Sequence, residues 1–208
     1  MKIQVKSDHY INNYDEKVRF CSYWHQIHEI LHLNSSEVLE IGQGNGFVSS
    51  YLKKKNVNIV TLDIDKELNP SFVGEVQNMP FEDNSYETVA CYEVLEHIPY
   101  DQAILGFSEI ARVAKKNVVI SMPDSTQVCR IHFHIPKIIE IKKIIRLPRI
   151  KKRFLEFDGQ HYWEIGKVNY PLNRIVNDIQ KYGLTLIKTY RVYEHPYHRF
   201  FVFQKKSL

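Results

Sequence analysis

The sequence predicts an α/β protein with a doubly wound, mostly parallel sheet of seven strands that ends in an antiparallel hairpin. Short runs of valine, isoleucine and leucine alternate with segments of helical periodicity, which is typical of a parallel sheet covered on both faces. A glycine-rich loop follows the first of these runs, where such sheets bind their ligands. This arrangement is Rossmann-like, and 208 residues suffice for one domain with a substantial core.

The elements are predicted in order from the N-terminus. An amphipathic helix over 14–33 leads into a strand at 37–41, and after the glycines a helix spans 47–55. Strands follow at 57–62, 72–73 and 86–91, and a helix over 102–113 precedes a strand at 117–122. A helix over 172–182 ends before Gly183, and strands at 184–193 and 199–204 are close enough in sequence to pair as a hairpin.

Two segments of the expected single domain, residues 1–208, lie outside this alternation. Residues 1–34 are expected to form an N-terminal helical cap that contains Tyr10 and Tyr14, and the sequence leaves open whether this cap covers a bound ligand. Residues 125–166 form an insertion, and its segment 137–153 interleaves lysines and arginines with isoleucines. That pattern predicts an amphipathic helix that serves either as a lid over the site or as a peripheral contact with an anionic membrane.

Charge and cysteine content exclude several classes of protein. The net charge of +4 is too small for an extended phosphate footprint, so no nucleic-acid partner is expected. Cys21, Cys91 and Cys129 are widely spaced and odd in number, so we expect no disulfide framework. His25 and His28 lack a nearby third ligand, and we expect no metal site. The sequence shows no membrane-spanning run and no leader, which favours a cytoplasmic location.

The loop at 40–46 predicts a site for a nucleoside cofactor. Gly42, Gly44 and Gly46 stand between a strand and a helix, where glycine lets the backbone turn tightly and approach a ligand. The helix that follows directs its unpaired N–H groups towards that ligand. Asp63 ends the second strand, where a carboxylate can accept hydrogen bonds from a ribose diol.

Two residues beside this loop distinguish between two classes of cofactor. A dinucleotide site needs a small residue where Phe47 stands, because the helix packs closely beneath a pyrophosphate. Glu40 repels a pyrophosphate and attracts an ammonium group. Both residues therefore favour S-adenosylmethionine over NAD.

The stretch from 38 to 123 resembles the class I S-adenosylmethionine-dependent methyltransferases, in their small-molecule, methyltransferase type 11-like branch. The resemblance is carried by five pieces in the family's order, at 38–46, 62–65, 78–86, 92–98 and 120–123. The segment 159–164 and the terminal hairpin also fit that branch, less specifically.

The resemblance implies a cofactor contact for each matching residue. Glu75 departs from the family, which usually has aspartate there, followed by a small residue. The implied contacts are Glu40, Gly42, Gly44 and Gly46 at the methionine end, Asp63 at the ribose, Ile64, Glu75 and Val76 at the adenine, and Cys91, Tyr92 and Glu93 near the sulfur.

The implied reaction is methyl transfer by direct displacement to a small-molecule, sugar or lipid-linked acceptor. His97 and His161 are candidate bases for a hydroxyl acceptor, although for His97 a structural hydrogen bond is the favoured explanation. The alternative is a non-catalytic protein that keeps the fold and binds S-adenosylmethionine or another nucleoside. The Asn/Asp-Pro-Pro-Tyr/Phe motif of nucleic-acid methyltransferases does not follow the fourth strand.

Overall fold

The computed structural model describes residues 14–148, 154–155, 157 and 159–206. Their main sheet has seven strands in the order β3-β2-β1-β4-β5-β9-β8. The first five in this order are parallel, and β9 runs antiparallel to both of its neighbours, which confirms the predicted fold class. The strands are β1 (Glu37–Ile41), β2 (Asn58–Asp63), β3 (Phe72–Val73), β4 (Tyr86–Tyr92), β5 (Ala114–Pro123), β8 (Leu184–Arg191) and β9 (His198–Lys205).

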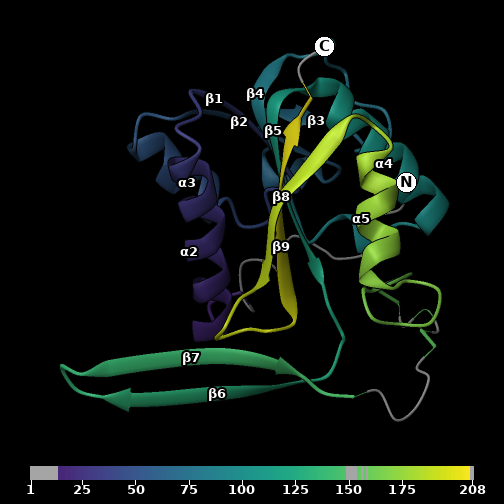
Figure 1. Ribbon diagram of the computed structural model, residues 1–208. Coiled ribbons are helices and arrows are strands. Elements are labelled where there is room, and N and C mark those ends of the chain that lie inside the picture. The colour runs from purple at the N-terminus through teal and green to yellow at the C-terminus, as the bar shows by residue number, and fades with distance from the viewer. Residues whose placement is uncertain (1–13, 149–153, 156, 158, 207–208) are drawn as a thin grey trace.

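Helices cover both faces of this sheet (Figure 1). The helices α2 (Lys17–His32) and α3 (Phe47–Lys54) pack on one face, and α4 (Tyr100–Val113) and α5 (Leu172–Gln180) pack on the other. Short 3-10 turns follow two strands, η1 (Lys66–Leu68) after β2 and η2 (Leu95–His97) after β4. None of the helices in the described part of the chain is long and apolar enough to cross a membrane.

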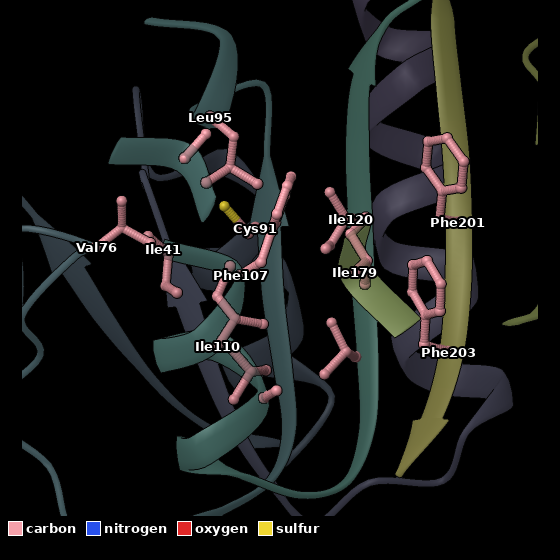
Figure 2. Close-up of a cluster of buried hydrophobic side chains, with 14 of the residues drawn as sticks. Ile41, Val76, Cys91, Leu95, Phe107, Ile110, Ile120, Ile179, Phe201 and Phe203 are labelled. Carbon is pink, nitrogen blue, oxygen red and sulfur yellow. The ribbon is translucent and has the colours of Figure 1, made fainter. Parts of the chain in front are cut away.

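The inner parts of the central strands are mostly apolar because successive side chains enter two different cores. On β4, Val89 and Cys91 join the core beneath α4 and α5, whereas Ala90 and Tyr92 join the core beneath α2 and α3. Figure 2 shows Cys91 near Phe107 of α4 in the first of these cores. Burial on both faces explains why the sequence shows unbroken apolar runs here and no alternation with polar residues.

The insertion after β5 contains a hairpin where the sequence predicts a helix. The strands β6 (Val128–Ile135) and β7 (Ile139–Arg146) pair antiparallel as a separate sheet, which extends past the carboxyl end of β5 in Figure 1. The helix predicted over 137–153 is therefore wrong for 139–146, and residues 149–153 lie outside the described part. Isoleucine is β-branched and favours strands, and Lys137 turns the chain with a left-handed φ of 64°.

The chain returns from this insertion through a segment that is fixed to the loop after β4. Trp163 is fully buried, and its indole N–H lies 3.1 Å from the carbonyl oxygens of both Leu95 and Ile98. The backbone N–H of Tyr162 donates to the carbonyl of Glu96 over 2.9 Å. These contacts place residues 159–165 beside η2, at the carboxyl end of the parallel strands.

Candidate active site

A pocket opens at the carboxyl ends of β1, β2 and β4, the edge of the sheet at which the sequence predicts the cofactor. The empty space within it, its open mouth included, is about 590 Å³. Seven of the residues singled out from the sequence line it, namely Tyr14, Glu40, Gly42, Gly44, Asp63, Tyr92 and Glu93.

The helix α2 adds Arg19, Tyr23 and Gln26 to this lining. The sequence contains no motif for them, because they reach the pocket only when the helical cap packs on the sheet. A link between these elements is the hydroxyl of Tyr92, which donates to the carbonyl of Gln26 over 3.3 Å. Tyr10, the other tyrosine of the predicted cap, lies outside the described residues.

The loop after β1 requires glycine for two reasons. Gly42 has a left-handed φ of 77°, and a Cβ there would lie 2.2 Å from Cγ2 of Val94. Gly46 has a φ of 70° and forms the N-cap of α3, and it does not line the pocket. The backbone of the loop therefore forms a wall of the pocket with no side chain at position 42.

Glu40 is buried in this pocket with an incomplete set of hydrogen bonds. It is 2% exposed, and its Oε2 has no hydrogen-bond partner among the described residues. Burial raises the pKa of Glu40 to about 8, against a hydrogen bond from Ser49 that lowers it. A buried carboxylate without a partner is costly, so the site suits a ligand that brings a positive charge.

Asp63 fixes the glycine loop to the end of β2. Its Oδ1 accepts the backbone N–H of Asp65 over 3.0 Å, and the backbone N–H groups of Gln43 and Gly44 also donate to the carboxylate. Burial raises the pKa of Asp63 despite these hydrogen bonds. The carboxylate thus stands at the pocket wall between β1 and β2.

Several of the implied contacts lie outside this pocket. Ile64 follows β2 and is half-buried, and Glu75 forms an isolated bridge with Asn78. The side chain of Val76 is buried in the core beneath α4. Cys91 belongs to the same core, and burial raises the pKa of its thiol well above the ordinary value.

The two histidines singled out from the sequence meet at η2, after β4. The rings of His97 and His161 lie 4.9 Å apart in an edge-on arrangement. Nδ1 of His97 donates to the carbonyl of Gln160 over 3.1 Å, and Nδ1 of His161 lies 3.1 Å from Oε1 of Glu164. Tyr197 donates to that same oxygen over 2.6 Å. Burial opposes the charge of Glu164, but the hydrogen bonds from His161 and Tyr197 outweigh it and lower the pKa.

Two buried carboxylates, Glu93 and Glu96, stand in the segment that leads from β4 to His97. Burial raises the pKa of Glu93 to about 7, and burial and Glu93 raise that of Glu96 well above its ordinary value. Glu93 has a left-handed φ of 54°, which is strained for a residue with a side chain and is often found at functional sites. The sequence singles out Glu93 but not Glu96, although Glu96 stands in the quoted motif beside His97.

Comparison with known proteins agrees with this geometry. Residues 39–122 match the model of the methyltransferase domain family. An uncharacterized protein of Methanocaldococcus jannaschii is 32% identical over 103 residues, and the match covers 44% of each chain, so this chain spans less than half of that relative's length.

Solved structures match over most of the chain. A Pyrococcus horikoshii protein aligns with a TM-score of 0.63 at 14% identity, over 97% of this chain and 100% of its own. Magnesium protoporphyrin IX methyltransferase of Synechocystis PCC 6803, with bound S-adenosylhomocysteine, gives 0.60 at 16% identity, over 91% and 85%. The Burkholderia thailandensis 1,6-didemethyltoxoflavin-N1-methyltransferase, with its acceptor and S-adenosylhomocysteine bound, gives 0.63 at 10% identity, over 97% and 87%. Residues 39–122 thus match the methyltransferase domain family, and the chain has the fold of the class I S-adenosylmethionine-dependent methyltransferases.

Proposed function

We propose that this chain, whose residues 39–122 match the methyltransferase domain family, transfers a methyl group from S-adenosylmethionine to a small-molecule acceptor. The observation that carries the proposal is the buried Oε2 of Glu40, which has no hydrogen-bond partner among the described residues and lies in a pocket that Asp63 also lines. An ammonium group pairs with Glu40, a ribose diol with Asp63, and the backbone at Gly42 and Gly44 allows close approach.

The residues of the chain bind, orient and shield the reactants. When bound, S-adenosylmethionine supplies a methyl group whose bond to sulfur breaks as its bond to the acceptor forms, with the electron pair left on sulfur. Glu93 and Val94 line the pocket next to the histidine cluster, so the acceptor binds between them and His161. For a hydroxyl acceptor, His97 or His161 takes the proton.

Calorimetric titration tests the cofactor assignment. We expect S-adenosylhomocysteine to bind with micromolar affinity and NAD to give no heat of binding. Glu40→Ala is expected to abolish the first signal, and Lys54→Ala, an exposed change on α3, to preserve it. Binding of NAD, or of neither compound, contradicts the proposal.

Turnover distinguishes the enzyme from a non-catalytic nucleoside-binding protein. The two methyltransferase relatives named above act on magnesium protoporphyrin IX and 1,6-didemethyltoxoflavin, which supports a small-molecule acceptor here. A panel of hydroxyl, carboxyl and amine compounds, with S-adenosylhomocysteine release as the readout, is expected to identify a class that reacts. Loss of that reaction with retained cofactor binding in His161→Ala supports the base role, and full activity removes it.

The hairpin of β6 and β7 bears on which acceptors reach this site. Its pairing places one apolar row on a single face, since Ile131, Phe133 and Ile135 of β6 lie on the same side of the sheet as Ile139 and Ile145 of β7. The side chains of Phe133 and of Ile138 at the tip are 50% and 78% exposed.

Basic side chains accompany this apolar face. Arg130, Lys142 and Arg146 lie on the opposite face, Lys143 lies within the apolar row, and Lys137 stands in the turn. An apolar row among cations matches the chemistry of an anionic membrane surface. We therefore propose that the hairpin makes a peripheral contact with such a surface and brings the site to a lipid-linked acceptor.

A further inference from the structure

Three metal-ligating side chains from two distant segments meet beside the pocket. Glu96 and His97 belong to η2, and His161 comes from the segment that Trp163 fixes against η2. One ligand atom from each of the three lies within 4.8 Å of the others. The side chain of Glu96 is 1% exposed, whereas those of His97 and His161 are 25% and 16% exposed. The cluster therefore combines one fully buried side chain with two side chains that solvent reaches.

Each imidazole is oriented by a hydrogen bond at its Nδ1. The Gln160 carbonyl can only accept, so Nδ1 of His97 carries the proton and Nε2 is the nitrogen with a lone pair. The carboxylate of Glu164 acts in the same way on Nδ1 of His161. Metal-bound histidines almost always donate their second ring N–H to a carbonyl or a carboxylate, and both histidines here do so.

The carboxylates beside these histidines, in contrast, have buried oxygens without a hydrogen-bond partner among the described residues. These oxygens are Oε1 and Oε2 of Glu96 and Oε1 of Glu93. Nε2 of His97 is 3.9 Å from Oε1 of Glu96, too far for a hydrogen bond. Arg19 lines the pocket with Glu93, and Lys167 is 3.6 Å from Glu164, so two cations stand against three carboxylates. A purely structural role for the cluster leaves the carboxylate of Glu96 buried at a cost.

We propose that Glu96, His97 and His161 bind one divalent transition-metal ion. Two imidazoles and one carboxylate suit zinc, iron, cobalt or manganese, and three protein ligands leave coordination positions open. This part of the inference does not depend on the proposed function. A second part rests on it, namely that the open positions bind oxygen atoms of the acceptor and so select acceptors with hydroxyl or carboxylate oxygens. In this arrangement the Nε2 lone pairs of His97 and His161 bind the ion, so neither histidine is the base predicted from the sequence.

Cobalt(II) titration of the full chain tests the site, with chelator-treated protein that carries no histidine tag. We expect one equivalent of cobalt to bind and to give the visible absorption bands of a nitrogen- and oxygen-ligated ion. His97→Ala and His161→Ala are each expected to weaken binding at least tenfold, and Glu164→Gln roughly ten- to a hundredfold through the orientation of His161. His134→Ala, on the exposed hairpin, is the matched control and leaves the titration unchanged.

Two further measurements separate this proposal from misfolding and from failure of the cofactor assignment. The variants are expected to bind S-adenosylhomocysteine with unchanged affinity, which shows that the pocket has folded. Chelation is expected to lower turnover at least tenfold, with restoration by zinc or manganese and no change in cofactor binding. The absence of stoichiometric cobalt binding, or equal binding in His97→Ala, His161→Ala and the native chain, overturns the metal site. Turnover that chelation leaves intact overturns the acceptor part alone.

Discussion

Gly42 lies against Val94 so closely that a Cβ at position 42 would come within 2.2 Å of Cγ2 of Val94. The two residues belong to the loops that follow β1 and β4, which are neighbours in the sheet. Their contact sets the distance between the cofactor loop and the loop that leads to Glu96 and His97. The left-handed φ of Gly42 excludes a side chain a second time, independently of the space.

Gly42→Ala is therefore expected to weaken S-adenosylhomocysteine binding at least tenfold and to lower Tm. Adding Val94→Ala removes the clash but leaves the strained φ, so the double variant recovers binding only in part. Gly159→Ala is the matched control, because its φ is 97° and no atom lies within 4 Å of its Cβ position. It bears only the backbone strain of about 1–2 kcal/mol. A Gly42→Ala variant that binds as well as the control refutes the role of the contact.

Glu40 is expected to make cofactor binding depend on pH. Its pKa of about 8 means that most molecules carry a neutral carboxyl at pH 7, whereas an ammonium group pairs with the carboxylate. Affinity for S-adenosylhomocysteine should rise about tenfold per pH unit up to pH 8 and then level off. Calorimetry at pH 7 in buffers of different ionisation enthalpy should detect the release of close to one proton. Glu40→Gln should bind roughly ten- to a hundredfold more weakly, without this pH dependence.

The same carboxyl is expected to destabilise the fold at high pH. The pKa of Glu40 is raised from 4.5 to about 8, so the folded state binds the proton more tightly than the unfolded state. Its contribution to stability is complete below pH 4.5 and is lost as the pH rises to 8. The difference in unfolding free energy between Glu40→Gln and the native chain should therefore grow in favour of the variant over this range. Urea denaturation at pH 5 and pH 9 measures it, and a difference that does not change with pH contradicts the expectation.

Trp163 is expected to affect turnover more than cofactor binding. Trp163→Phe keeps a buried ring but removes the N–H that serves the carbonyls of Leu95 and Ile98, at a cost of about 1–3 kcal/mol. The segment that carries His161 then loses its fixed position beside η2. Phe203→Leu, a buried change on β9, provides a control of similar instability. Turnover that falls equally in both variants, at matched fractions folded, shows that Trp163 has no positioning role.

Much of the fold could be predicted from the sequence because its signals are local. Apolar runs, the glycine loop and the cap at Gly183 each depend on a few adjacent residues, and the structure confirms the elements to within a few positions. The hairpin could not be predicted, because isoleucines interleaved with lysines satisfy both the helical and the strand period. Periodicity alone does not decide such a segment, and here the β-branched side chains favour the strand.

The site was predictable only where its residues form one motif. Glu40 is the last residue but one of β1 and Asp63 is the last residue of β2, so the sequence marks both, and the pocket brings them together. Arg19 and Gln26 line the pocket from α2, and no motif in the sequence marks these two residues as part of a site. Glu96 becomes a candidate ligand because the fold buries it and places His161 beside it. Neither its burial nor this contact can be predicted from the spacing of the residues along the chain.

The hairpin is expected to bind vesicles that contain anionic lipid. The double change Lys142→Glu and Lys143→Glu replaces one cation within the apolar row and one on the opposite face of the hairpin by anions, and should reduce the vesicle-bound fraction about tenfold or more. Phe133→Ser should reduce it as well, because an exposed ring is then lost from the surface that enters the interface. Co-sedimentation at low salt with vesicles of phosphatidylglycerol and phosphatidylcholine measures both effects.

The matched control places the same charge change on a helix of the sheet domain. Lys54→Glu and Lys55→Glu alter two exposed lysines at the end of α3 and should leave vesicle binding nearly unchanged, because charges far from the bound surface are screened. Equal loss in both double variants would show that net charge alone attracts the protein. If the native chain fails to sediment with anionic vesicles, the membrane contact is refuted. The other role predicted from the sequence for 137–153, a lid over the site, then remains.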